Sequence, residues 1–191
     1  MKKSTIYIKN MVCQCCLRVI REELEKAGVV VDEISMGKAV ISYDAAQVTM
    51  EDIRQVLQLL GTDLIESREH RLVEEIKLGV IELIHQMNNV DSIVRKSEYL
   101  VEKTGLSYPY LSRIFSAHEH ITLEKYIILN KIERIKELID QEEFTLSEIA
   151  FMMDYSSVQY LSNQFKQATG MTVSEYRESD RSSKKSLDRL Y

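Results

Sequence analysis

Two stretches of the chain, 50 residues apart, carry the same residue pattern. When the sequence is shifted by this distance, aromatic, leucine and hydroxyl positions coincide in both stretches. The matching pairs are Ser97 and Ser147, Glu98 and Glu148, Ser107 and Ser157, Tyr110 and Tyr160, Leu111 and Leu161, Ser112 and Ser162, Phe115 and Phe165, Thr122 and Thr172, and Tyr126 and Tyr176. The repeat predicts two related units in tandem.

Each stretch is predicted to fold as a short helix, a turn and a second helix. Gly105 lies in the first turn, where a positive φ is wanted, and Asp154 occupies the equivalent region of the second. Thr145 and Glu148 form a capping-box pattern. The expected helices are Ser97–Thr104 and Tyr108–Ala117 in one unit, and Leu146–Met153 and Ser157–Ala168 in the other. This is helix-turn-helix geometry.

A continuous helix is expected between the two units, over Leu123–Asp140, because isoleucines recur on one face. Its roughly 18 residues would span about 27 Å at 1.5 Å per residue. With packing offsets, this length suits two helices about 34 Å apart in successive major grooves of DNA. The spacer is therefore compatible with DNA binding on one face of the duplex.

The N-terminal third of the chain has a different pattern, in which β-branched runs alternate with helical periodicity. Strands are expected at 5–9, 29–31, 38–43 and 62–65, with one helix starting near Cys16 and another at Thr49. This βαββαβ order is typical of the ferredoxin-like fold. We therefore expect an α+β ferredoxin-like domain followed by an all-α domain with two helix-turn-helix units.

Strand patterns cease after Glu66, and Arg71–Met87 carries apolar residues on one helical face. The sequence therefore predicts a ferredoxin-like domain at 1–66, a helix-turn-helix domain at 71–180 and a charged tail at 181–191. The connection between the two domains is short and charged. Such a connection would let a change in one domain bias the other.

The charge balance argues against a uniformly basic nucleic-acid coat protein, because the net charge is -5. The N-terminus has no apolar signal segment and no run is long enough to cross a bilayer, so we expect a cytoplasmic protein without membrane contact. No catalytic triad, P-loop or dinucleotide motif stands out, and the histidines lack ligand spacing. We do not expect an enzyme.

The three cysteines, Cys13, Cys15 and Cys16, all lie within four consecutive positions. Cysteines this close cannot staple distant segments together. In a reducing compartment such thiols are more often metal ligands or redox groups than structural disulfides. The cluster therefore calls for a chemical role.

The second half of the chain, over Arg71–Arg177, resembles the DNA-binding domain of the AraC-type transcription regulators. The resemblance rests on Leu146-Ser147-Glu148-Ile149-Ala150, Tyr155-Ser156-Ser157, Tyr160–Lys166 and Thr169–Arg177, echoed by Tyr110–Phe115. Two departures are Asp154-Tyr155, where the family usually has Gly-Phe, and Val173, where it often has Pro. The resemblance implies a transcription regulator whose partner is a double-stranded DNA operator. The resemblance also makes a second copy of the chain and RNA polymerase candidate partners.

In that family the exposed face of each second helix enters the major groove. By motif position this implies Ser112 and Arg113 in the first unit, and Gln159, Tyr160 and Asn163 in the second. Arginine bonds guanine bidentately, and Asn or Gln bonds adenine. The alternative is a solvated helix face, with a packing role for Tyr160. Phosphate contacts are expected from Arg113, Lys166 and Arg177, and from the tail residues Arg181, Lys184 and Lys185.

The first part, over Ser4–Ile65, resembles the heavy-metal-associated domain of copper chaperones and metal-pumping ATPases. Met11-Val12-Cys13-Gln14-Cys15-Cys16 matches that family's M-x-C-x-x-C motif between the first strand and first helix. The resemblance implies Cu(I) held by Cys13 and Cys16, since thiolates at a helix start have lowered pKa values and favour soft cations. Cys15 is a departure from the family, and as a third ligand it would shift the preference towards Zn(II) or another soft metal. Met11 is expected to pack rather than bind.

Two other interpretations remain open for the N-terminal domain. It could have lost metal binding and serve only in dimerisation or in sensing another signal. The CxxC pattern is also found in thioredoxin-like redox proteins, although the proline and tryptophan common around such sites are absent here.

Overall fold

The computed structural model describes residues 1–86 and 96–178, so the tail residues Arg181, Lys184 and Lys185 lie outside the described residues. The chain divides into two compact units, one comprising Met1–Leu78 and the other starting at Gly79. The division falls inside helix α3, Arg68–Gln86, rather than at the predicted boundary near residue 66. The reason is that the first part of α3 contacts the N-terminal strand: the Arg71 guanidinium lies 4.5 Å from the centre of the Tyr7 ring.

The first unit has the predicted order of strands and helices. Its elements are β1 (Lys2–Lys9), α1 (Gln14–Lys26), β2 (Val30–Ser35), β3 (Lys38–Tyr43), α2 (Met50–Leu59) and β4 (Asp63–Leu64). The sheet order is β2-β3-β1-β4, and every neighbouring pair is antiparallel. The first and last strands of the unit therefore lie side by side in the sheet, although more than 50 residues separate them in the chain.

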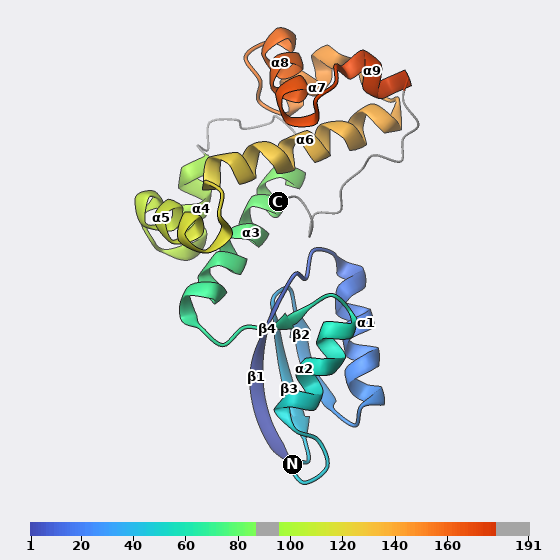
Figure 1. Cartoon of the computed structure of the whole chain (residues 1–191), viewed down its shortest axis with the longest axis vertical. Helices are drawn as coiled ribbons and strands as arrows, with labels where there is room; N and C mark the ends of the chain where they lie inside the picture. The colour runs from blue at the N-terminus through green and yellow to red at the C-terminus, as the bar shows by residue number, and fades with distance from the viewer. Residues whose placement is uncertain (87–95, 179–191) are drawn as a thin grey trace. The chain divides into compact units, whose positions relative to one another are not determined.

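One face of the sheet forms the core of the first unit. Ile6 and Ile8 of β1 are buried, whereas Thr5 and Lys9 are exposed, which is the period-two alternation of a strand with one covered face. Both helices of the unit lie over the covered face (Figure 1). They contribute the buried side chains Ile20, Leu24, Ile53 and Leu57.

The first helix starts two residues earlier than the sequence indicated. It was expected near Cys16, but α1 begins at Gln14 because the Cys16 amide donates a hydrogen bond to the Cys13 carbonyl oxygen at 3.1 Å. Cys13 therefore occupies the N-cap position. Cys15 and Cys16 lie in the first helical turn, where backbone N–H groups have no intrahelical partners.

The second unit contains both predicted helix-turn-helix pairs. After α3, its helices are α4 (Lys96–Thr104), α5 (Tyr108–Glu119), α6 (Leu123–Gln141), α7 (Leu146–Met152), α8 (Val158–Thr169) and α9 (Val173–Glu178). Helix α4 packs on α5, and α7 packs on α8. Figure 1 shows α6 running between the two pairs. None of the described helices is both long and apolar enough to cross a bilayer.

Helix α6 is more deeply buried than a simple spacer would be. Ile132, Ile135 and Ile139 are buried as their periodicity predicts, but so are Lys131 and Lys136. Lys136 pairs with Glu133 at 2.7 Å. Lys131 donates a hydrogen bond to the Met153 carbonyl oxygen at 2.5 Å. Buried ammonium groups need such partners because they have left water.

The Lys131 contact should stabilise the second helix-turn-helix pair. In Lys131→Met, the aliphatic part of the side chain is kept but the Met153 carbonyl loses its donor. We expect the variant to lose about 1–3 kcal/mol of unfolding free energy, measured by urea denaturation of the full chain. Lys125→Met removes an exposed lysine from the same helix and is the control. Equal stability of the two variants would contradict this role.

Candidate functional site

The second helix of each pair buries one face and exposes the other. In α5, Leu111, Ile114 and Phe115 are buried. In α8, Leu161 and Phe165 are buried at the positions that the repeat relates to Leu111 and Phe115. These five side chains therefore belong to the core of the second unit. The opposite faces carry the side chains that remain free to meet a ligand.

On α5 the exposed face is formed by Tyr110 and Arg113. The Arg113 guanidinium carbon lies 5.2 Å from the centre of the Tyr110 ring, which is within the range of a cation–π contact. Ser112 is only half exposed and lies beside this face. The sequence interpretation omitted Tyr110, although the repeat pairs it with Tyr160 and so pointed to it.

On α8 the predicted residues Gln159, Tyr160, Asn163 and Lys166 are all exposed. The Gln159 side-chain amide donates a hydrogen bond to the Asn163 side-chain oxygen at 3.0 Å. Residues four apart on a helix share a face, so this bond orders the two amides together. The exposed face of α8 therefore presents an amide pair, whereas that of α5 presents an arginine stacked on a tyrosine.

The turn before α8 explains one departure from the family pattern. Asp154 adopts a φ of 55°, in the left-handed region that the family usually gives to glycine. Tyr155 is buried, and its hydroxyl donates to the side-chain oxygen of Gln164 at 2.5 Å. Burial raises the pKa of Tyr155, so this hydroxyl stays protonated. Asp154 thus adopts the left-handed conformation that the turn needs, and Tyr155 bonds the turn to α8.

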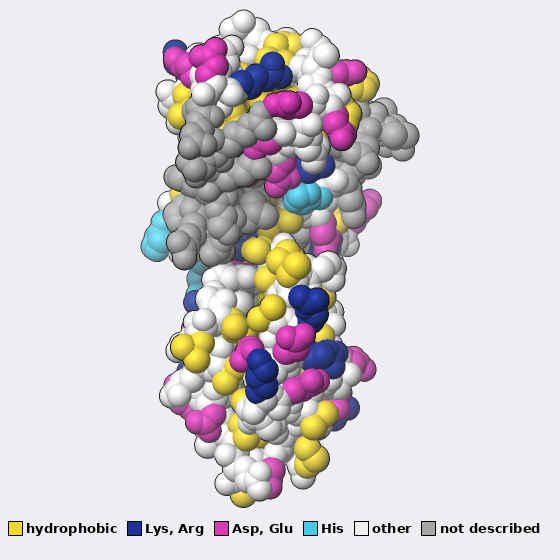
Figure 2. Space-filling view, turned by 90° about the vertical axis from the view of Figure 1, so that its right-hand side faces the viewer, with side chains coloured by type: hydrophobic (Ala, Val, Ile, Leu, Met, Phe, Trp, Pro, Cys, Tyr) yellow, Lys and Arg dark blue, Asp and Glu magenta, His cyan; other side chains and the backbone are white. Residues whose placement is uncertain are grey.

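Exposed charges of both signs occur on the second unit, for example Lys166 and Glu175. Arg113, Lys166 and Arg177 are exposed on α5, α8 and α9, respectively. On the face shown in Figure 2, Lys and Arg side chains lie among Asp and Glu side chains, and the described part of that face carries no continuous basic patch. From Arg71 onward, 16 Lys and Arg residues stand against 19 Asp and Glu residues, a net charge of -3. Contacts to an anionic polymer would come from individual cations.

The cysteines lie at the entrance to α1 in the first unit. The Sγ atoms of Cys13 and Cys16 are 3.4 Å apart. Cys13 and Cys15 are exposed, while Cys16 is half buried against the core. Met11 is 1% exposed, so it packs as predicted and cannot reach a surface ligand. Burial raises the pKa of Cys13, but hydrogen bonds from the Cys16 side chain and from the Cys16 and Cys15 amides outweigh it and lower the pKa.

The Cys13 and Cys16 thiols fit a two-thiolate metal site after a small movement. With zinc–sulfur bonds of about 2.3 Å, two sulfurs on a tetrahedral ion lie about 3.8 Å apart, and on a linear ion about 4.6 Å apart. The observed 3.4 Å is nearer to the bent arrangement. Within residues 1–86 and 96–178, no three His, Cys, Asp or Glu side chains are gathered as a ready metal cage. The geometry thus offers two ligands, and Cys15 is not preplaced as a third.

Comparison with known proteins bears on the second unit. Residues 100–179 match a family model described as a helix-turn-helix domain. The match covers α5 to α9 and agrees with the two helix pairs described above. The chain is also 24% identical over 172 residues to the xylose operon regulatory proteins of Escherichia coli strains K12 and O157:H7. These alignments include 86% of this chain but only 44% of each relative. No solved structure matches the chain.

The contacts of Cys13 predict a pH-dependent reactivity. Since its pKa is lowered, the Cys13 thiolate should persist to lower pH than an ordinary cysteine thiolate. The alkylation rate against pH, measured in Cys15→Ser with the label localised by fragment ions, should therefore have a midpoint below the ordinary thiol value. Cys15→Ser/Cys16→Ala should shift this midpoint upward, because the Cys16 sulfur is gone. An unshifted midpoint would refute the role of Cys16.

Proposed function

We propose that the chain is a sequence-specific DNA-binding transcription regulator, with α5 and α8 as its recognition helices. The observation that carries the proposal is the pair of helix-turn-helix units, each with an exposed second helix bearing side chains that can bond base edges. The helix-turn-helix match over residues 100–179, the resemblance to AraC-type regulators and the similarity to xylose operon regulatory proteins support it. We propose binding and regulation in the cytoplasm, rather than catalysis.

The side chains exposed on α5 and α8 support recognition of different bases by the two helices. Arg113 can bond O6 and N7 of guanine in the major groove, and Asn163 or Gln159 can bond N6 and N7 of adenine. Helix α6 has 19 residues and so a length of about 28 Å, which supports placement of the two recognition helices in successive major grooves. We therefore propose an operator with a guanine contact in one half and an adenine contact in the other.

Affinity would depend on few phosphate contacts. With a net charge of -3 from Arg71 onward, non-specific attraction to DNA is weak. Lys166 and Arg177 are the described residues that we assign to phosphates, while the tail cations proposed for this role lie outside the described residues. A homodimer and a contact with RNA polymerase remain part of the proposal.

We further propose that the N-terminal unit, as a ferredoxin-like heavy-metal-associated domain, binds a soft metal ion and thereby alters DNA binding. The support is the 3.4 Å pair of thiols at the start of α1 and the lowered pKa of Cys13. Cys13 and Cys16 would hold Cu(I) or Zn(II), with Cys15 close enough in sequence to join on rearrangement. The competing proposals are a dimerisation unit, a sensor of another signal and a thiol redox protein.

The DNA proposal is tested on an operator selected from random duplexes with the full chain. Arg113→Ala should weaken binding to that operator by about 1–3 kcal/mol and relax the preference at one base pair. Lys166→Ala should weaken all sequences alike and reduce the salt slope by about 1. Arg18→Ala, which removes an exposed arginine of α1, is the control and should change neither property. An unchanged base preference in Arg113→Ala would reject the assignment.

The metal proposal is tested by anaerobic titration of the reduced full chain with Zn(II) and with Cu(I). Cys13→Ser and Cys16→Ser should each strongly weaken metal binding, because each leaves only one thiolate of the 3.4 Å pair. Cys15→Ser is the matched control and should retain a site. Absence of binding in the unchanged chain would reject the metal proposal. Loss of binding in Cys15→Ser would replace the two-thiolate site with a three-thiolate one.

A further inference from the structure

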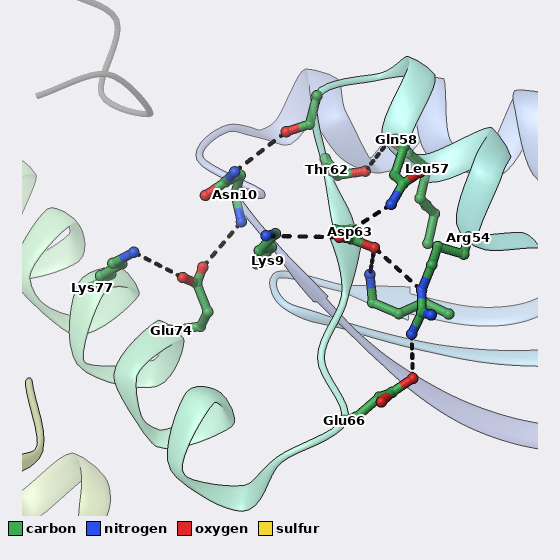
Figure 3. A network of polar contacts seen from close by, with 12 residues as sticks. Lys9, Asn10, Arg54, Leu57, Gln58, Thr62, Asp63, Glu66, Glu74 and Lys77 are labelled. Carbon is green, nitrogen blue, oxygen red and sulfur yellow. Dashed lines mark hydrogen bonds and ion pairs between the residues drawn. The ribbon is translucent and has the colours of Figure 1, made fainter. Parts of the chain in front are cut away.

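The entrance to the cysteine loop, defined here as residues 10–16, is held by a residue far away in the sequence. Asn10 has a φ of 63°, and its backbone N–H donates to Oε2 of Glu74 at 3.0 Å. Its side-chain amide donates to the Gly61 carbonyl oxygen at 3.3 Å. Figure 3 shows Asn10 between these two partners. The chain is thus tethered on both sides immediately after β1 ends.

Glu74 is itself held in place. Its second carboxylate oxygen, Oε1, accepts a hydrogen bond from Lys77 Nζ at 3.0 Å, and the two side chains are only 12% and 11% exposed. A surface pair such as Lys26 and Glu23 is far more exposed, at 68% and 38%. Shielding from water strengthens a charge-assisted hydrogen bond, so the carboxylate is a firm anchor for the Asn10 amide.

The tether reaches the thiols through very little chain. Met11 follows Asn10 and is buried, and Cys13 lies three residues after Asn10. A metal complex would hold the two sulfurs further apart than 3.4 Å, which displaces the Cys13 side chain relative to the first turn of α1. Any backbone displacement at Cys13 would pass through Val12 and Met11 to Asn10, whose bond to Glu74 would resist it.

Glu74 lies on a helix that also contacts the helix-turn-helix domain. In the second unit, Glu82 of α3 accepts a hydrogen bond from the Tyr99 hydroxyl at 3.0 Å and pairs with Lys103, both on α4. A Cβ atom at Gly79 would lie 2.9 Å from a methyl carbon of Leu100, so α3 approaches α4 closely. Helix α4 is the first helix of the pair that presents Arg113. One continuous helix therefore contacts both the cysteine loop and this pair.

We propose that Glu74 is the positioning residue of the cysteine loop and that its bond to Asn10 couples the thiols to α3 and hence to DNA binding. The inference rests on the proposed function and adds the element that carries the response. Because coupling between two ligands is reciprocal, operator DNA should change the affinity for metal by the same factor as metal changes the affinity for DNA.

The test compares operator affinity with and without Zn(II) in the full chain and in three variants. Glu74→Met/Lys77→Met removes the acceptor without leaving a buried unpaired charge. It should bind operator as the unchanged chain does without metal, yet Zn(II) should no longer change that affinity. Glu74→Gln keeps an acceptor oxygen and should retain part of the response. Glu75→Met replaces an exposed glutamate on the same helix and should retain all of it.

A second measurement needs no metal. Hydrogen exchange of the Asn10 amide should be faster in Glu74→Gln than in the unchanged chain and fastest in the double variant, with Glu75→Met unchanged. A full Zn(II) response in the double variant, or equal exchange in all four proteins, would overturn the proposal. If the double variant does not fold, a full response in Glu74→Gln overturns it instead.

The two levels of inference fail differently. If the unchanged chain binds no Zn(II), or Zn(II) leaves operator affinity unaltered, the proposed metal response fails and the coupling role falls with it. The positioning role of Glu74 is then tested only by hydrogen exchange of the Asn10 amide. If Zn(II) changes the operator affinity of the unchanged chain and of the double variant equally, the proposed function survives and the role of Glu74 is rejected.

Discussion

Burial of α6 on nearly all sides is the constraint on which the second unit depends. A helix in this position must be apolar or must provide partners for its charges, and α6 does both. Its isoleucines fill the core, while Lys136 pairs with Glu133 and Lys131 bonds a backbone carbonyl at the end of α7. The polar groups therefore fix neighbouring elements at defined points. Apolar packing alone would leave those elements free to slide along each other.

This burial also decides which faces of α5 and α8 remain exposed. Since the leucines and phenylalanines of both helices face the core, the residues left outside are largely polar or aromatic. The two exposed faces have diverged within one scaffold. One holds an arginine against a tyrosine ring, and the other holds two amides bonded to each other. A shared fold thus supports two different chemistries of contact.

Local and repeating patterns were predictable from the sequence, whereas long-range polar contacts were not. The repeat predicted both helix pairs, and the short apolar run in Thr5–Lys9 predicted the first strand. The exposure of Gln159, Tyr160 and Asn163 agrees with what the family resemblance implied by motif position, and Lys166 is exposed as a phosphate contact requires. The Asn10–Glu74 bond joins residues 64 apart, and Lys131 is buried although lysine side chains are usually exposed. Neither leaves a periodic signal, because each depends on how separate elements pack.

The division of the chain inside α3 has a consequence for how such proteins can diversify. A recombination event between residues 66 and 71 would pass through the loop between two folds, but it would separate Asn10 from Glu74 and Tyr7 from Arg71. A replacement N-terminal unit would have to bring its own first half of α3 and join at Gly79. Gly79, at the division between the two units, is therefore the position within α3 where such an exchange would leave both of these contacts intact.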